Sequence, residues 1–290
     1  MAHNQLPVFY NPKMFVEEAQ PSPSSKKPRL LVEQWLDNHY PIEIIDFPAL
    51  EVEKFYLAHE RRHVDDILSL RKKNGMQTRS AQLRDSLFYT NSSILNAAHY
   101  VMRESKPVAI SPTSGFHHAE HAKAMGYCTF NGLMITAIDL LQRGIKKVGI
   151  LDCDQHYGNG TAEIIEKFGL EKQVIHITSQ QDYWPLPVYR DEFFEKLPNF
   201  FTAFKSCDIL LYQAGADCHI EDPFGGFLTT EQMALRDKIV FEQCRANSLP
   251  VVWNLAGGYQ EQADGLGGTQ IDKVLELHTN TLMECIKVYG

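Results

Sequence analysis

The chain has 290 residues, of which 44% are hydrophobic, and a formal net charge of −8. A chain of this length can bury a large core, as one large α/β domain or as two small ones. The acidic balance argues against non-specific binding of nucleic acid, which needs a basic surface. No apolar run reaches the roughly 18 residues of a membrane helix. We therefore expect a globular protein that binds neither nucleic acid nor membranes.

The N-terminal stretch indicates a cytoplasmic location, and the cysteines are interpreted in that setting. MAHNQLPVFYNP contains no basic segment followed by an apolar one, as a secretory signal would. The six cysteines form no CxxC pair, which indicates reduced packing residues and not disulfides or a cysteine zinc site. These cysteines are Cys128, Cys153, Cys207, Cys218, Cys244 and Cys285.

The first hundred residues predict helices around one loop. EEAQPSPSSKKPR, residues 17–29, carries the Pro and Ser signals of a flexible loop, which we expect at the rim of a functional site. We interpret its basic end, KKPR, as part of this solvated loop and not as a nuclear localisation signal. The helical patterns cover 30–38, 53–73 and 80–104.

From residue 107 onward, short β-rich runs alternate with longer helical patterns. Strands separated by such helices imply βαβ crossovers and a parallel sheet, and nearly all-apolar strands indicate helices on both of its faces. We therefore predict one α/β domain over 1–290 with an open, mostly parallel sheet. The predicted strands are 107–111, 147–152, 173–178, 208–213 and 250–255, and the predicted helices are 131–143, 160–168, 191–205, 229–246 and 270–288.

Chemically active residues follow all five predicted strands. In open α/β sheets, the ligand site lies at the carboxyl ends of the strands. Each strand here is followed by Gly, His, Asp or an aromatic residue, which packing alone does not predict. The strand ends therefore indicate one shared site. In chain order they read PTSGFHHAEH, DCDQHYGNG, TSQQDYWP, AGADCHIEDPFGG and AGGYQ.

The second strand end places acidic and imidazole side chains at alternate positions. In extended backbone, Asp152, Asp154 and His156 point to the same side. Asp217, at another strand end, is able to join them. Such a set suits a divalent metal with an open position for water or substrate. Because the set is rich in carboxylates, iron, cobalt and manganese stay open beside zinc.

A buried ion-pair network, or carboxylates that cap helices, would use the same residues. The residues at the neighbouring strand ends favour the metal site. They include His117, His118 and Tyr259, which are groups able to move protons or to donate a hydrogen bond.

Four segments, in order, resemble the zinc-dependent histone deacetylase family and its relatives that deacetylate polyamines, within the arginase/deacetylase superfamily. The resemblance is close over residues 100–262 and loose before them, and AHERRHVDDIL and GGFLTTEQMALRDKIVF are similar to the class IV branch. The four segments are SGFHHAEHAKAMGYCTFN, ILDCDQHYGNGT, YQAGADCHIEDPFGG and AGGYQ.

The resemblance implies a zinc site and a catalytic pair. Asp154, His156 and Asp217 would bind one zinc ion. His117 and His118 would be the tandem histidines beside the reacting water.

The same resemblance implies roles for residues around the zinc site. Asp152 would hydrogen-bond His117, and Tyr259 would point its hydroxyl at the substrate carbonyl. Tyr127 and Trp184 match the walls of an acyl-lysine tunnel, and Gly126 matches its floor.

A structural potassium ion is also implied by the resemblance. It would be held by oxygens from two strand ends. The matching positions are the side chain and carbonyl of Asp152, the carbonyls of Asp154, His156 and Ser179, and the hydroxyl of Thr178.

The residue types agree with amide hydrolysis. A metal polarises the carbonyl and lowers the pKa of bound water from about 15.7 to roughly 7. His118 is able to take the proton of the water, a step typically worth on the order of 10² to 10⁴ in rate. Tyr259 is able to stabilise the oxyanion, where loss of one donor costs about 10² to 10³. The leaving amine then takes a proton from His118 or His117, and a carboxylate behind His117 fixes its tautomer.

The sequence departs from the family pattern at three positions. Asn159 stands where many members have a second Asp, and an amide orients His118 without stabilising its charged form. We therefore expect a less basic His118, and either histidine stays open as the base. His63 stands where class IV members tend to have Tyr. Phe224 occupies a rim position often held by Leu or Met and would narrow the tunnel mouth.

Three other interpretations explain less of the sequence. HHAEH, residues 117–121, matches the inverted zinc-protease pattern but directly follows PTSG, whereas that pattern needs both ligands on one helix. Arginase-like two-metal hydrolases need carboxylates where Gly158 and His219 stand. A non-catalytic acyl-lysine binding module would have lost a ligand or Tyr259, and none is lost.

We therefore predict a zinc-dependent amidohydrolase that removes an acyl group, acetyl or longer, from the Nε of lysine in a protein or peptide. An acetylpolyamine is the alternative substrate, since a narrow aromatic tunnel suits any flat amide on a long aliphatic stem. Acyl length and oligomeric state stay open.

Overall fold

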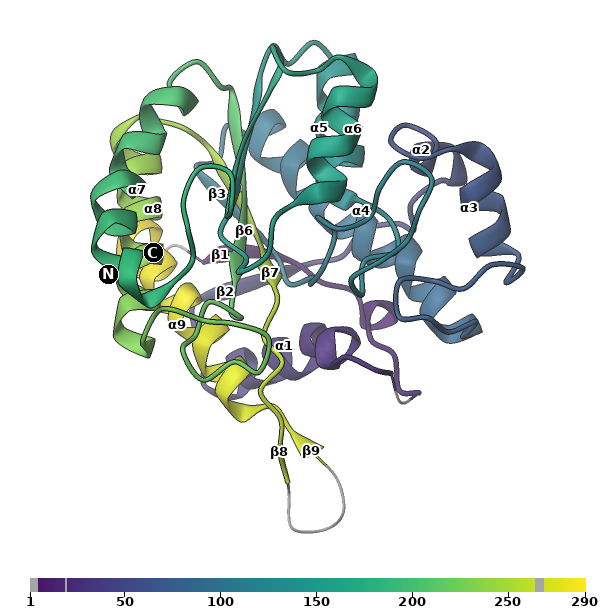
Figure 1. The fold of residues 1–290 in the computed structure, drawn as a ribbon, viewed down its shortest axis with the longest axis horizontal. Coiled ribbons are helices and arrows are strands. Elements are labelled where there is room, and N and C mark those ends of the chain that lie inside the picture. Colours follow the sequence, from purple (N-terminus) through teal and green to yellow (C-terminus); the bar gives the residue numbers. More distant parts are fainter. Residues whose placement is uncertain (1–4, 19, 264–268) are drawn as a thin grey trace.

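Seven strands form one parallel sheet in the computed structural model, which describes residues 5–18, 20–263 and 269–290 (Figure 1). The strand order is β2-β1-β3-β7-β6-β4-β5. The seven strands are β1 (Leu6–Phe9), β2 (Ile42–Ile45), β3 (Val108–Ser111), β4 (Val148–Asp152), β5 (Val174–Thr178), β6 (Ile209–Gly215) and β7 (Val251–Ala256). The short strands β8 (Gln262–Ala263) and β9 (Thr269–Gln270) pair antiparallel outside this sheet.

Helices cover both faces of the sheet (Figure 1). The α-helices are α1 (Lys27–Asp37), α2 (Val52–Phe55), α3 (Arg61–Leu68), α4 (Ala81–Arg103), α5 (Gly132–Gln142), α6 (Asn159–Phe168), α7 (Arg190–Phe204), α8 (Thr230–Ala246) and α9 (Asp272–Tyr289). Three short 3-10 helices cover Pro12–Met14, Pro23–Ser25 and Pro187–Tyr189.

Two apolar cores follow from the alternation of side chains along the strands. In β6, Leu210 and Tyr212 pack into the core beneath α1, α7, α8 and α9, whereas Ile209 and Leu211 pack into the core beneath α2 to α6. A strand covered in this way is apolar at every position, because both of its faces are buried. The predicted α/β fold with a mostly parallel sheet and helices on both faces is confirmed.

The predicted elements after residue 107 agree with the structure, but the N-terminal part differs. The strands β1 and β2 are not predicted from the sequence; each is only four residues long, and they pair with each other at one edge of the sheet. Runs this short have no reliable periodicity. The single helix predicted over 53–73 is two helices, α2 and α3.

The segment 17–29 is not a loop throughout, so this part of the prediction is wrong. Pro23–Ser25 forms a 3-10 helix, and α1 begins at Lys27. Lys27 has no exposed surface, which contradicts the solvated loop expected for KKPR. Residue 19 of this segment lies outside the described residues.

All six cysteines are free and buried, as predicted for reduced packing residues. Among the described helices, none combines the length and the apolar character that crossing a bilayer requires.

A buried carboxylate joins three of the helices that cover one face. Asp139 of α5 is 1% exposed and accepts hydrogen bonds from Lys54 of α2, His99 of α4 (2.7 Å from Nε2) and Arg143 (2.6 Å from Nε). Although burial alone would raise it, these three donors hold the pKa of Asp139 well below its usual range.

We expect Asp139→Asn to lower the free energy of unfolding by about 1–3 kcal/mol, because the amide lacks the negative charge and one of the two oxygens that accept from Lys54, His99 and Arg143. Urea denaturation followed by circular dichroism at pH 7 measures this change. Asp191→Asn is the control, since the side chain of Asp191 is 95% exposed. Equal stability of the two variants would show that Asp139 does not hold these helices together.

Candidate metal centre and active site

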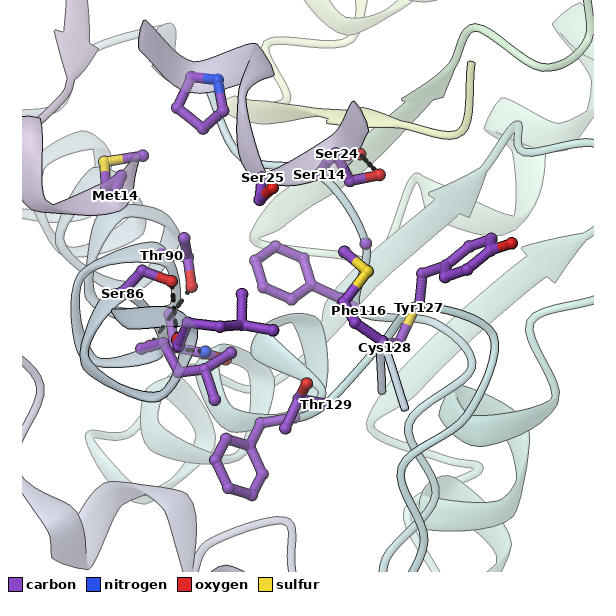
Figure 2. Close-up of a pocket in the computed structure, with 17 residues that line it drawn as sticks. Met14, Ser24, Ser25, Ser86, Thr90, Ser114, Phe116, Tyr127, Cys128 and Thr129 are labelled. Carbon is purple, nitrogen blue, oxygen red and sulfur yellow. Dashed lines mark hydrogen bonds between the residues drawn. The ribbon is translucent and has the colours of Figure 1, made fainter. Parts of the chain in front are cut away.

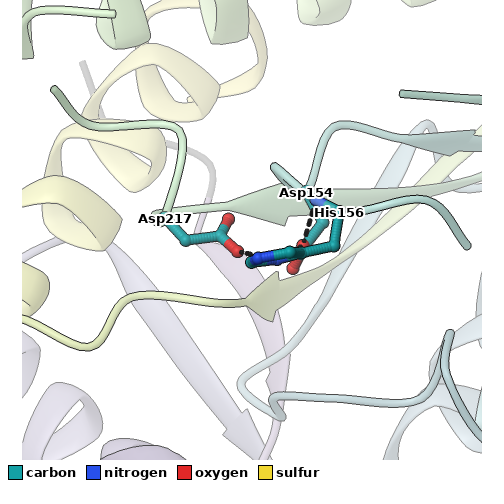
Figure 3. Close-up of side chains that lie close together, drawn as sticks. All are labelled: Asp154, His156 and Asp217. Carbon is teal, nitrogen blue, oxygen red and sulfur yellow. Dashed lines mark hydrogen bonds and ion pairs between the residues drawn. The ribbon is translucent and has the colours of Figure 1, made fainter. Parts of the chain in front are cut away.

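The three predicted zinc ligands meet at the carboxyl edge of the sheet (Figure 3). Asp154 and His156 follow β4, and Asp217 follows the neighbouring strand β6. Each residue offers a ligand atom, and these atoms all lie within 4.8 Å of one another. His156 Nδ1 lies 3.1 Å from Asp154 Oδ1 and 3.1 Å from Asp217 Oδ2. Asp217 stands 61 positions after His156 and 63 after Asp154. The pairing of β4 with β6 brings it to them.

The electrostatics of this cluster fit a divalent cation. Asp217 is fully buried, and burial raises its pKa to about 7, with the Asp154 carboxylate as the second cause. Against the opposing effect of burial, His117 and His156 hold the pKa of Asp154 well below its usual range. Two adjacent buried carboxylates repel each other unless a positive charge lies between them. Two carboxylate oxygens and one imidazole nitrogen are the donor set of a zinc site with an open position.

The tandem histidines lie beside the ligands and have different partners. His117 Nδ1 lies 2.8 Å from Asp152 Oδ2, and His117 Nε2 lies 3.7 Å from Asp154 Oδ1. His118 Nδ1 lies 2.6 Å from Asn159 Oδ1. The two imidazole rings are 4.0 Å apart, between centroids. One histidine is therefore backed by a carboxylate and the other by an amide.

These partners give the two histidines opposite charge preferences. Burial disfavours the charged form of both. At His117 the Asp152 carboxylate overcomes burial and raises the pKa to about 9. At His118 burial, and then the neighbouring His117, lower the pKa to about 4. The less basic His118 expected from Asn159 agrees with this difference.

Tyr259 lies among aromatic rings next to the ligands. Its ring centroid is 5.6 Å from that of Tyr127 and 5.0 Å from that of Phe224, which meets it edge-on. The backbone N–H of Tyr259 donates to Asp222 Oδ2 over 2.8 Å, which fixes the loop after β7. Burial, followed by the charge of Asp154, raises the pKa of the Tyr259 phenol well above its usual value, so the hydroxyl keeps its proton.

Gly126 and Trp184, which are also predicted to line the tunnel, differ from each other in their surroundings. Gly126 packs under His118, where an added Cβ would lie 2.4 Å from the imidazole Cδ2, and its φ of +55° also favours glycine. Trp184 is 55% exposed, and no aromatic pair in the described part of the chain includes it. The structure therefore brings Gly126, Tyr127 and Phe224 to the site but leaves the Trp184 ring on the surface.

The oxygens predicted to hold potassium lie just beneath the metal ligands. Thr178 and Ser179 are fully buried, and Thr178 pairs with Asp152 across β4 and β5. The hydroxyl of Tyr183 lies 3.2 Å from the Asp152 carbonyl and 3.5 Å from the Asp154 carbonyl. Both carbonyls therefore point toward the Tyr183 hydroxyl. Tyr183 lies within the strand end TSQQDYWP, but no role is predicted for it from the sequence.

Two buried cations were also missed by the sequence analysis. Lys27 donates a hydrogen bond to the Gly257 carbonyl, and burial lowers its pKa to about 8 although Asp217 opposes this. Arg236 is fully buried in α8 and donates to the carbonyls of Cys153 (3.2 Å) and Gly215 (2.7 Å). The sequence does indicate that Lys27 is buried, because it stands four positions before Leu31 and so shares the buried face of α1.

A cavity of about 50 Å³ lies behind Tyr127 and Cys128 (Figure 2). Ser24 and Ser25, from the segment predicted as a loop, line it together with Ser114 and other residues. The three metal ligands do not line this cavity. It has room for a few water molecules.

The comparisons with known proteins agree with this geometry. The histone deacetylase domain family matches residues 23–189, which is more than half of the 290 residues. The chain therefore belongs to the histone deacetylase domain family.

Individual relatives are more distant. Histone deacetylase 18 of Arabidopsis thaliana is 33% identical over 128 residues, 38% of this chain and 19% of the plant protein. The HD domain of HDA15 superposes with a TM-score of 0.77 at 19% identity, over 98% of this chain and 90% of that chain. An acetylpolyamine aminohydrolase of Burkholderia pseudomallei superposes with a TM-score of 0.72 at 15% identity, over 99% and 100% of the two chains. The chain spans less than two thirds of the length of the curated relatives that it first matches, such as 58% of a probable deacetylase of Methanothermobacter thermautotrophicus.

We expect Asp217→Asn to weaken zinc binding by at least about tenfold, since loss of even an outer-shell partner typically costs 10–100-fold in affinity. Competition with a chromogenic chelator measures the affinity, and we expect the wild type to bind one zinc ion per chain. Asp208→Asn is the control, because Asp208 accepts hydrogen bonds from the backbone of Lys146 and Lys147 at the opposite end of β6. Unchanged affinity in Asp217→Asn would exclude Asp217 as a ligand.

Proposed function

We propose that residues 1–290 form one catalytic domain that hydrolyses the acyl amide of an acylated lysine side chain with one zinc ion. The observation that supports it most is the placement of three groups at one sheet edge. These are the ligand cluster of Asp154, His156 and Asp217, the unlike pair of His117 and His118, and the phenol of Tyr259.

Zinc, when bound by the three ligands, supplies a Lewis acid that polarises the amide carbonyl and lowers the pKa of water. His118 is then the general base, because its lowered pKa leaves its imidazole neutral and able to accept the proton of the attacking water. His117 stays protonated against Asp152 and stabilises the negative charge that develops next to it. Tyr259 donates its hydroxyl proton to the oxyanion in a hydrogen bond. The leaving amine takes its proton from the tandem histidines.

A structural potassium ion belongs to this proposal. The side chain and carbonyl of Asp152, the hydroxyl of Thr178 and the carbonyl of Ser179 would hold it, with carbonyls from Asp154 and His156. The complete burial of Asp152, Thr178 and Ser179, whose oxygens belong to the predicted set, supports this assignment.

The substrate is proposed to be an acyl-lysine exposed on a protein or peptide. Gly126, Tyr127 and Phe224 would contact its aliphatic stem near Tyr259, and Trp184 would contact the part of the substrate outside the tunnel. An acetylpolyamine is the second candidate, favoured by the structural likeness to an acetylpolyamine aminohydrolase. A binding module without activity would use the same fold, but all proposed ligands and Tyr259 are present here.

We expect Tyr259→Phe to lower kcat by about 10² to 10³, because it removes one donor to the oxyanion. Acetate release from an acetyl-lysine peptide by zinc-loaded protein measures the rate, and zinc affinity should not change. Tyr89→Phe is the matched control, since the Tyr89 hydroxyl contacts Lys13 on the surface. Similar rates for the two variants would contradict the role of Tyr259.

The substrate class is tested by offering the zinc-loaded protein an acetyl-lysine peptide, a long-chain acyl-lysine peptide and an N-acetylated polyamine side by side. We expect the peptides to give the higher kcat/KM. Faster turnover of the polyamine would replace the proposed substrate, and turnover of none of them with zinc bound would contradict the proposed activity.

A further inference from the structure

Asn159 lies between two side chains that need opposite ends of its amide. Its Oδ1 lies 2.6 Å from His118 Nδ1, and its Nδ2 lies 2.9 Å from Glu120 Oε1. The sulfur of Met125 lies 3.7 Å from the same Nδ2. A carboxylate and a thioether accept hydrogen bonds. Both neighbours of Nδ2 are therefore acceptors, which makes the NH₂ group the correct end of the amide on this side.

The orientation of the amide determines the tautomer of His118. With its NH₂ group directed at Glu120, Asn159 presents a carbonyl oxygen to His118 Nδ1. A carbonyl oxygen only accepts, so Nδ1 of His118 must carry a proton. A neutral imidazole with its proton on Nδ1 has its lone pair on Nε2. If the amide were reversed, the NH₂ group would instead select the other tautomer, in which Nδ1 is the acceptor.

The backbone around Glu120 is fixed on both sides. Its carbonyl lies 2.9 Å from Nδ1 of His59, a histidine that is 1% exposed, and its N–H donates to Lys123 O over 2.9 Å. The N–H of Glu60 donates to the carbonyl of the next residue, His121, over 2.9 Å. Glu120 is half-buried, and its fixed backbone places its carboxylate within hydrogen-bond distance of Asn159.

The start of α6 packs directly against the tandem histidines. The N–H of Thr161 donates to the His117 carbonyl over 3.0 Å. Gly160 lies so close that an added Cβ would be 2.4 Å from the Ala119 carbonyl oxygen. Asn159, the first residue of α6, is therefore placed against His118 by backbone contacts that do not depend on its own side chain.

We propose that Glu120 is a positioning residue: it orients the Asn159 amide so that His118 is held in the Nδ1–H tautomer with Nε2 free to act as the base. This inference rests on the proposed function. It explains how an amide at position 159 orients the base as a carboxylate would, because a carboxylate and a correctly turned amide oxygen both accept from Nδ1. Position 159 has no carboxylate in this chain, but the carboxylate of Glu120 is hydrogen-bonded to the Asn159 amide that contacts His118.

Selective ¹⁵N labelling of histidine tests the tautomer directly on zinc-loaded protein without substrate. The signals of His118 are those that vanish in His118→Gln. We expect a protonated Nδ1 in the wild type and in Glu120→Gln, whose side-chain oxygen still accepts from Asn159, but a mixture of tautomers in Glu120→Leu. Glu163→Leu is the control, since the Glu163 carboxylate accepts from the His121 backbone, whereas the side chain of Asn159 contacts His118, Glu120 and Met125. A protonated Nε2 in the wild type, or an unchanged tautomer in Glu120→Leu, would overturn the proposal.

Turnover of an acetyl-lysine peptide is the second measurement. We expect Glu120→Leu to lower kcat/KM by about tenfold, as is typical for loss of an outer-shell partner, and Glu120→Gln to stay within about threefold of the wild type. The double variant Glu120→Leu with Asn159→Asp should recover activity, because a carboxylate at 159 needs no orientation. Failure of this rescue in a folded protein would show that Glu120 does not act through Asn159. The tautomer measurement needs no turnover, so it separates this proposal from failure of the proposed function.

Discussion

The burial of three carboxylates at one edge of the sheet is the constraint on which the rest of the site depends. Asp152, Asp154 and Asp217 are at most 2% exposed. An unpaired carboxylate in such surroundings is strongly disfavoured unless positive charge or hydrogen bonds compensate it. Asp152 is compensated by His117 and by the side-chain N–H of Gln213. Asp154 and Asp217 both contact His156, and Asp154 also lies 3.7 Å from Nε2 of His117. A divalent cation between the two carboxylates would complete their compensation.

The cationic side chains around this edge also hold the backbone that carries the ligands. Arg236 donates to carbonyls in the segments after β4 and near the end of β6, and Lys27 donates to the carbonyl of Gly257 after β7. These are the three strand ends that carry the proposed metal ligands and Tyr259. Arg236 is itself paired with Asp237, which also accepts from the hydroxyl of Tyr212 and, over 2.6 Å, from that of Thr281. The geometry of the site is therefore connected to the packing of α1, α8 and α9.

Much of the site could be predicted because its signals are local. Asp154 and His156 stand two positions apart after an apolar strand, and the ends of parallel strands meet at one edge, which brings Asp217 to them. The strands β3 to β7 are recognisable because burial on both faces makes them continuous apolar runs. The strands β1 and β2 are not recognisable, since four residues are too few to show a hydrophobic periodicity.

What could not be predicted depends on contacts between distant segments. Lys27 was expected in solvent, and only the packing of α1 against the strand ends buries it. Glu120 and Tyr183 stand near predicted residues in the sequence, but their partners are selected by side-chain directions in the folded chain. Trp184 differs in the opposite direction from Lys27. The resemblance implies that it forms a wall of the tunnel, whereas the structure leaves it 55% exposed.

The central claim is that Asp154, His156 and Asp217 together hold one metal ion beside the tandem histidines. Diffraction from crystals of the zinc-loaded protein, recorded above and below the zinc absorption edge, tests it most directly. We expect one strong anomalous peak per chain, within about 2.0–2.2 Å of a carboxylate oxygen of each aspartate and of Nδ1 of His156. A peak elsewhere, or none in protein that contains stoichiometric zinc, would contradict it.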